Sequence, residues 1–522
     1  MTRTRWWLLG SAAAIAIGLA VVAAVMAWSY RPSVLRAKAV AALSERLGLD
    51  VSLEGLSFSF FPAFGLTGRG LVARIPERPD LPPFIVIEKF RVDGGVQGVV
   101  RGHFSAAHLE GLKINIPPGE AKKDIGPDNG PDANDGDSSW SKQVVIDRVD
   151  TPNAELTILR RKPGAEPLVF QIHQLELSDV GFDRQIPFRT KLTNPIPRGL
   201  VDSSGHLGPF PPGQPSELPL DGDYTFTGAD LDTIKGIAGT LTSNGHYDGV
   251  ISRLTVVGQT ETPDFSLDLG GRPLPLRADF EVVVDGTNGA TELKRVNAKL
   301  LNTDIAVTGM IDNLPGPGNR SITLNAKITK GRMEDLWRLV VPSDKSSFSG
   351  DVALQADMAL PPGPGRKRDR WHIAGAFAVA AAHFEQPQIQ AKLAELSRRS
   401  QGKNADQAPV DVFSNVRSDF SLDRGVLSLS ALQFEVPGAA VHLRGNFETN
   451  SGALDLEGEL KMQAAMSRVV GGWKGMLVKP FDFVFKRDGA GAVIPISVQG
   501  TRQSPDLNIQ FGKLLKRGFG GK

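Results

Sequence analysis

The sequence predicts a mainly β protein, with an apolar N-terminal helix, a long run of antiparallel strands and a few short helices. Three features of its 522 residues support this fold class. Apolar and polar residues alternate with a period of two through most of the chain, as in strands with one buried and one wet face. Glycine and proline, 57 and 36 residues, recur at short intervals and indicate many turns. Residues 6–30 hold no charged side chain.

Residues 1–31 are predicted to form a transmembrane anchor. Their apolar part, Trp6–Trp28, has 23 residues and would span roughly 34 Å as a helix, enough to cross a hydrocarbon core of about 30 Å. It is longer than the apolar region of a cleaved signal peptide, and aromatic rings stand at both ends. We expect the short tail to stay inside and the bulk of the chain to be exported, because long domains translocate largely regardless of charge. The predicted anchor residues are Trp6, Trp7, Leu8, Leu9, Ile15, Ile17, Leu19, Val21, Val22, Val25, Met26 and Trp28.

Four regions follow the anchor. An amphipathic helix is expected over residues 32–49, where apolar residues recur on one helical face. A first β region is expected at 50–116. Residues 117–139 lack aromatic residues and are rich in Asp, Asn, Gly and Pro, which predicts a flexible loop. A repetitive β region then covers residues 140–522.

Two further patterns lie within the repetitive region. Short helices are expected near Met333, in "MEDLWRLVV", and near Gln388, in "QIQAKLAELSRRSQG". The stretches 256–270 and 498–512 both suggest a strand, a glycine, a polar turn and a Pro-Asp pair that opens the next strand. This similarity favours one recurring β unit over unrelated domains.

The sequence contains no motif typical of catalysis or metal binding. The absence of cysteine excludes a disulfide, a thiolate metal site and a cysteine nucleophile. The eight histidines form no H-E-x-x-H motif, and neither a G-x-S-x-G elbow nor a phosphate-binding loop occurs. The Asp-rich run at 132–137 departs from a calcium loop, since Gln143 replaces the bidentate Glu. We expect no catalytic residue, metal ligand or cofactor, and a net charge of +2 argues against a nucleic-acid partner.

A long sheet with one apolar face must cover that face by curling, by stacking on a second layer or by binding a ligand. The residues alone leave a closed sandwich core and an open apolar groove as alternatives, because aliphatic side chains suit both. If the sheet curls into a groove, the alternating apolar residues line it. The candidate groove-lining residues are Leu53, Leu56, Phe58, Phe60, Phe265, Leu267, Leu269, Phe280, Val282, Val284, Ile322, Leu324, Val352 and Leu354.

Several stretches, taken in order, resemble the AsmA-like family of envelope proteins. They include "VSLEGLSFSFFPAFGLTGRGLVARIP" after the anchor, then "LQFEVPGAAVHLRGNF", and finally "SRVVGGWKGMLVKPFDFVFKRDGAGAVIPISVQG". The resemblance covers most of the chain, with a C-terminal block at about 405–515. It implies a single-pass protein of the bacterial inner membrane, with an elongated, curled antiparallel sheet that forms an apolar groove in the periplasm.

The resemblance also implies a function and partners. Larger members of the family are regarded as bridges that carry phospholipid toward the outer membrane, so we expect this chain to bind or conduct phospholipid for outer-membrane biogenesis or maintenance. The partners would be phospholipid, the inner membrane and outer-membrane or envelope proteins. One alternative is a periplasmic scaffold whose strand edges pair with outer-membrane proteins during assembly. A hydrolase with a triad assembled from distant strands is a third, less favoured reading.

Overall fold

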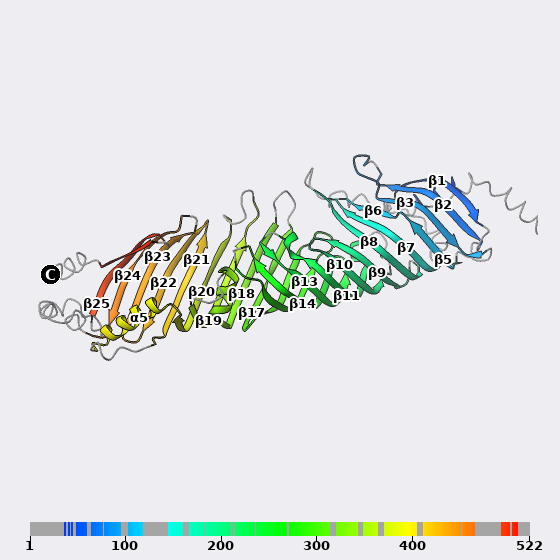
Figure 1. The fold of residues 1–522 in the computed structure, drawn as a ribbon. Helices are drawn as coiled ribbons and strands as arrows, with labels where there is room; N and C mark the ends of the chain where they lie inside the picture. The colour runs from blue at the N-terminus through cyan, green and yellow to red at the C-terminus, as the bar shows by residue number, and fades with distance from the viewer. Residues whose placement is uncertain are drawn as a thin grey trace, which may run out of the picture. The chain divides into compact units, whose positions relative to one another are not determined.

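The computed structural model is mainly β, and its strands belong to one large, mostly antiparallel sheet (Figure 1). This confirms the predicted fold class at that level. The described residues fall into two compact units, unit 1 within 1–226 and 247–252, and unit 2 within 227–246 and 253–522. The structure describes residues 36–37, 40–41, 43–44, 49–59, 64–76, 78–95, 103–117, 145–159, 166–181, 183–209, 211, 215–234, 236–268, 271–313, 320–342, 348–363, 370–403, 411–449, 451–464, 492–501 and 504–509.

The predicted anchor and most of the predicted loop at 117–139 lie outside the described residues. Within the described ranges, no helix is long and apolar enough to cross a membrane. The described residues of the predicted amphipathic helix at 32–49 are helical between Arg36 and Ser44. Arg36 donates a hydrogen bond from Nη1 to the carbonyl oxygen of Glu54, 3.0 Å away, which ties this helix to the first strand.

Unit 1 is a meander in which successive strands pair antiparallel, with one exception. Strands β4, β5 and β6 each pair in parallel with β7. The strands are β1 (Asp50–Ser59), β2 (Gly65–Arg74), β3 (Ile85–Asp93), β4 (His103–Phe104), β5 (Ala106–Glu110), β6 (Lys113–Ile116), β7 (Val145–Ile158), β8 (Leu168–Val180), β9 (Ile186–Pro195), β10 (Arg198–Leu207) and β11 (Pro219–Asp230).

The spacing of buried residues in β1 changes where β2 contains a left-handed glycine. Val51 and Leu53 are buried two residues apart, whereas the next buried residue, Leu56, follows after three. Glu54 and Gly70 face each other here without forming a register pair. Gly70 has a φ of +62°, which glycine adopts without steric cost, and a Cβ there would lie 2.4 Å from Cδ of Glu54. This local break leaves Leu53 and Leu56 both buried.

In unit 2 successive strands from β14 to β26 pair antiparallel, with register shifts in several of the pairings. Short 3-10 turns, η3 (Pro215–Glu217) and η4 (Leu231–Thr233), flank β11. The remaining strands are β12 (Ile237–Ala238), β13 (Thr240–Val250), β14 (Arg253–Leu267), β15 (Leu274–Val284), β16 (Thr291–Leu300), β17 (Thr303–Asn313), β18 (Arg320–Arg332), β19 (Phe348–Leu360), β20 (His372–Phe384), β21 (Ser414–Asp423), β22 (Val426–Val436), β23 (Ala439–Glu448), β24 (Ala453–Met462), β25 (Ala492–Thr501) and β26 (Ser504–Ile509).

The two Pro-Asp stretches do not adopt the same structure. The prediction is correct for the second stretch, where β25 ends at Thr501 and β26 opens at Ser504. It is wrong for the first, where β14 continues through Pro263 with a register shift between Thr262 and Phe265. The shift accommodates proline, which cannot donate to a sheet ladder, as a bulge rather than as a turn.

Both helices predicted in the repetitive region are confirmed. Helix α4 (Met333–Val340) follows β18 directly, and α5 (Pro387–Ser400) follows β20 and lies across the ends of later strands (Figure 1). In α5, Glu395 accepts hydrogen bonds from Arg398 and Arg399, which hold the pKa of that carboxyl below its usual value.

Candidate functional site

The strand register of unit 2 places apolar residues together on one face of the sheet, which we call the inner face. From β17 to β21, for example, a single row across the strands contains Ile305, Ile328, Leu354, Phe377 and Ser418. Adjacent rows repeat this arrangement because each hairpin keeps the alternation in phase. Further inner-face residues are Leu276, Phe280, Val296, Val307, Leu324, Met358, Ile373, Phe420, Leu422, Leu427, Phe434, Leu443, Phe447, Leu454, Leu460, Ile496 and Val498.

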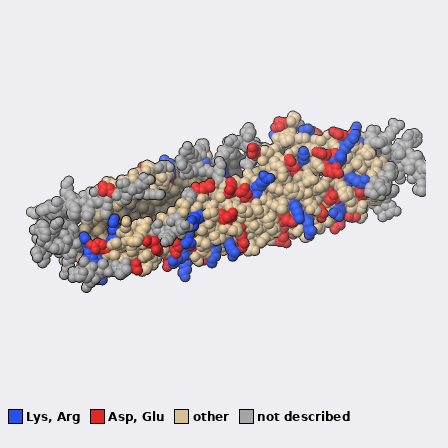
Figure 2. Space-filling view, in the orientation of Figure 1, with Lys and Arg blue, Asp and Glu red and all other residues tan. Residues whose placement is uncertain are grey.

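Most charged residues lie on the opposite face, which we call the outer face. Among the described residues paired in register from β14 to β25, the inner-face positions are uncharged except Arg320, which is exposed at the start of β18. The outer face has cross-strand ion pairs instead, such as Arg444 with Glu457 at 3.2 Å. Figure 2 shows charged side chains scattered over unit 2, and a hollow in its surface lined mainly by uncharged residues. The inner face therefore suits a hydrocarbon surface.

Much of the inner face is only half-buried. The side chains of Leu324, Leu354, Phe377, Phe420 and Leu443 all keep partial contact with solvent. In a closed sandwich a second layer would bury such large side chains fully. Among the described residues of unit 2, helices α4 and α5 are the elements that pack on this face, and both do so at one end of the strands. The described part of unit 2 thus has apolar surface that no second sheet covers.

The structure places most of the predicted groove-lining residues of unit 2 on one face. Phe265 pairs with Leu274 after the bulge in β14, and Leu267 pairs with Ile237 of β12. Phe60 and Leu269 lie outside the described residues. The predicted residues whose register puts them together on the inner face are Phe265, Phe280, Val282, Val284, Ile322, Leu324, Val352 and Leu354.

The predicted residues of unit 1 belong to the first strand. Leu53 and Leu56 are buried, and Phe58 is half-buried, with its ring stacked on Phe64 at a centroid distance of 5.8 Å. Buried residues Val51 and Ala73 belong to a small core beneath the N-terminal helix. Leu53 and Leu56 thus contribute buried apolar side chains to unit 1.

The predicted groove-lining residues include none from β20 to β25, and the clearest omission is in β20. There "HIAGAFAVAAAHF" contains apolar residues on both faces, because Ala374, Ala376 and Ala378 occupy outer positions. In this strand only side-chain size alternates with a period of two, since Phe377 and Val379 are large and their outer neighbours are small. A comparison of side-chain volume along the strand, rather than polarity, would have identified them.

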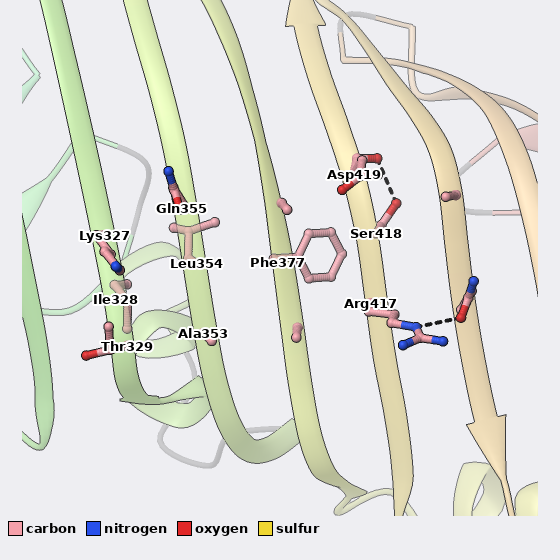
Figure 3. Close-up of a pocket in the computed structure, with 14 residues that line it drawn as sticks. Lys327, Ile328, Thr329, Ala353, Leu354, Gln355, Phe377, Arg417, Ser418 and Asp419 are labelled. Atoms are coloured by element: carbon pink, nitrogen blue, oxygen red, sulfur yellow. Dashed lines mark hydrogen bonds between the residues drawn. The ribbon is translucent and has the colours of Figure 1, made fainter.

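Two cavities, of about 570 and 600 Å³, lie among the described residues of unit 2. Most residues that line the first are on the outer face, among them Ala353, Ala376 and Ala378, and the inner-face residues Leu354 and Phe377 also line it (Figure 3). Arg417, another lining residue, donates a hydrogen bond to Gln433 of the next strand. The cavities are open depressions lined mainly by residues of the outer face.

Titratable residues in the described part of the chain form ion pairs on the strand surface rather than clusters. No group of three or more His, Cys, Asp or Glu residues there could hold a metal ion. Cross-strand pairs include His108 Nδ1 with Asp150 Oδ1 at 2.6 Å and His372 Nδ1 with Asp423 Oδ1 at 2.9 Å. His173 Nε2 lies 2.8 Å from the hydroxyl of Thr193, an exposed contact between neighbouring strands.

Unit 1 has a small hydroxyl cluster between β10, β11 and the end of β13. Ser203 is buried, its hydroxyl donates to the carbonyl oxygen of Asp223 at 2.9 Å, and Oη of Tyr247 lies 2.7 Å from it. Burial raises the pKa of the Tyr247 hydroxyl, although the hydrogen bond with Ser203 opposes this. Gly222 leaves room for the ring, since a Cβ there would lie 2.7 Å from Oη of Tyr247.

No protein-family model, curated protein or solved structure matches this chain. The resemblance to the AsmA-like family therefore rests on the sequence stretches quoted above. Any function must be argued from the inner face itself.

Proposed function

We propose that this chain is a non-catalytic lipid-binding protein whose inner face holds phospholipid acyl chains. The observation that supports the proposal best is the combination of two properties in unit 2. The inner face is uncharged over the described, register-paired residues from β14 to β25 except for Arg320 at the start of β18, and many of its large side chains, such as Leu354 and Phe377, are half-buried. An apolar surface of this extent is unfavourable in water unless another apolar surface covers it.

Acyl chains meet the physical requirements of such a face. Each methylene removed from water contributes about 0.8 kcal/mol, so roughly 14 buried methylenes contribute about 11 kcal/mol before ordering costs. A face without charges imposes no desolvation penalty on hydrocarbon, and it gives a charged ligand nothing to pair with. A repeated row of Leu, Ile, Val and Phe across successive strands also offers no fixed polar contact, which suits ligands that slide or exchange.

The cellular setting of the proposal comes from the sequence. The apolar stretch within residues 1–31 would anchor the chain in the bacterial inner membrane, with the bulk of the chain in the periplasm. There the sheet would curl into a groove that receives phospholipid and serves outer-membrane biogenesis or maintenance. The AsmA-like resemblance supports this setting.

A pair of charge substitutions in one strand tests the proposal. Leu354 is on the inner face and its neighbour Ala353 is exposed on the outer face. Leu354→Asp places a carboxylate among acyl chains, whereas Ala353→Asp adds the same charge to a surface that already has charges. We expect phospholipid that copurifies with the full chain, measured by mass spectrometry, to fall several-fold in Leu354→Asp and to stay unchanged in Ala353→Asp.

Hydrogen exchange of both variants provides the folding control. Equal lipid content in two folded variants would contradict the proposed binding face. Crosslinking that recovers outer-membrane proteins, with no lipid in the wild-type chain, would favour the scaffold alternative instead.

A further inference from the structure

The inner face of unit 2 ends at two different edges. At the first, which we call the helix edge, strands β18, β20, β22 and β24 end and β19, β21, β23 and β25 begin. At the second, which we call the hairpin edge, the turns β15–β16, β19–β20, β21–β22 and β23–β24 reverse the chain. The antiparallel meander thus puts both helices at one edge, since α4 follows β18 and α5 follows β20.

The helix edge is closed. Met333 and Leu336 of α4 pack against a core cluster that includes Ile328, Val352 and Val379. Leu393 and Leu396 of α5 pack in the same way on a second cluster further along this edge. Near this edge Leu267, Phe348 and Phe384 are half-buried. Most other inner-face residues near it are buried, among them Leu274, Leu300, Ile328, Val352, Val379, Val436, Ala439, Met462 and Ile494.

Buried polar contacts fix both helices in place. Oδ2 of Asp335, on α4, accepts from the backbone N–H of Asn302 at 2.9 Å and from the Thr303 hydroxyl at 3.0 Å. On α5, Ser397 donates to the carbonyl oxygen of Pro437 at 2.7 Å, and Gln390 donates to that of Val412 at 2.9 Å. A polar group that emerged at this edge would have to displace these contacts.

The hairpin edge is open by comparison. Of the inner-face residues near it, Leu360 is buried, Arg320 is exposed, and most of the apolar ones are half-buried. The turns beyond them are polar, and the guanidinium side chain of Arg424 is 81% exposed. The half-buried residues at this edge are Leu254, Val284, Thr291, Ile311, Ile322, Ile373, Leu422, Leu427, Phe447 and Leu454.

We infer that unit 2 binds amphiphiles in one orientation, with the polar headgroup at the hairpin edge and the hydrocarbon directed toward the helix edge. This inference rests on the proposed function, and it adds which edge the ligand uses. The physical reason is that a headgroup must stay hydrated, and in the described part of unit 2 the hairpin edge joins half-buried apolar surface to exposed polar turns, whereas α4 and α5 cover apolar residues at the helix edge. The ends of the acyl chains would then contact the apolar residues beside the closed helix edge.

Two photoreactive phospholipids test this orientation on the full chain incubated with vesicles. One has a diazirine in the headgroup and the other has it at the end of an acyl chain, and mass spectrometry maps the labelled peptides. We expect the headgroup probe to label Asp423–Leu427 and Phe447–Leu454 several-fold more than α4 or α5. We expect the acyl probe to label peptides that contain Leu354 and Phe377.

The outcomes separate the two claims. Headgroup labelling of α4 or α5 at a level equal to or above that of the hairpins would overturn the orientation, while acyl labelling of the inner face would leave the proposed function standing. Absence of acyl labelling on inner-face peptides would overturn both. Leu354→Asp is the specificity control, because it should lower labelling by both probes.

Discussion

Leu354 and Phe377 are direct cross-strand partners in β19 and β20, and both lie on the inner face. Their chain neighbours Ala353 and Ala378 are also partners, on the outer face. The two faces of these strands therefore differ in side-chain size as well as in charge.

The loss of unfolding free energy in alanine variants of this face shows whether a position is open to solvent or part of a closed core. Phe→Ala in a sealed core costs about 3–5 kcal/mol, but Phe377 is half-buried, so we expect Phe377→Ala to cost about 1–2 kcal/mol. Ile328 is only 4% exposed beneath α4, and Ile328→Ala should cost about 2–5 kcal/mol. In urea unfolding of lipid-free protein, Ile328→Ala should therefore lower the free energy of unfolding more than Phe377→Ala, although isoleucine is the smaller side chain. The reverse order would indicate that Phe377 is sealed.

The left-handed glycine in β2 gives a second prediction. Gly70 and Gly95 have φ values of +62° and +65°, so alanine at either site costs about 1 kcal/mol from backbone conformation. A Cβ at Gly95 meets no described atom within 4 Å, whereas at Gly70 it meets Glu54. We expect Gly70→Ala to destabilise unit 1 more than Gly95→Ala in thermal unfolding. Glu54→Ala in the Gly70→Ala background should remove the excess, and an unchanged excess would refute the clash.

The anchor of α4 gives a third prediction. Asp335 is 1% exposed and accepts two hydrogen bonds from the Asn302–Thr303 turn. Asp335→Ala removes the acceptor of both donors, of which the Thr303 hydroxyl is buried, and this costs about 1–3 kcal/mol. Hydrogen exchange should speed up in α4 and in that turn, and Asp335→Asn, which keeps an acceptor oxygen, should restore part of the protection. Unchanged exchange in Asp335→Ala would contradict this role.

Tyr247 gives a prediction on pH. Because burial raises its pKa in the folded chain, its contribution to stability is present below the unfolded pKa of about 10 and is lost as pH rises through the folded value. The chain has three tyrosines, so tyrosinate absorbance can resolve each. Tyr247→Phe should remove the component that titrates last. A titration without a late component in the wild-type chain would contradict the burial effect.

The period of two predicted the strands of unit 2 and the face of residues such as Phe280, Val282 and Leu324. It succeeded because antiparallel pairing keeps alternation in phase from strand to strand. It could not predict that β14 runs through Pro263, because whether a proline becomes a turn or a bulge depends on the neighbouring strand. It also missed Phe377, whose outer neighbours are alanines.

The sequence did not predict which residues of the apolar face are covered by a helix and which remain half-buried. Val352 and Leu354 look alike in the alternating pattern, yet Val352 is buried beneath α4 and Leu354 is half-buried. That difference depends on where a helix some residues away folds back onto the sheet, which is a tertiary property. The change in the spacing of buried residues beside Glu54 likewise depends on the left-handed backbone conformation of Gly70, which the order of apolar and polar residues does not specify.

The lipid content of the wild-type full chain tests the central claim most directly. The chain would be extracted from membranes, washed extensively, and examined by native mass spectrometry together with phosphate analysis of the organic extract. The proposed function predicts phospholipid in molar excess over protein. A folded chain that repeatedly yields no phospholipid, and takes up none from vesicles, would contradict it.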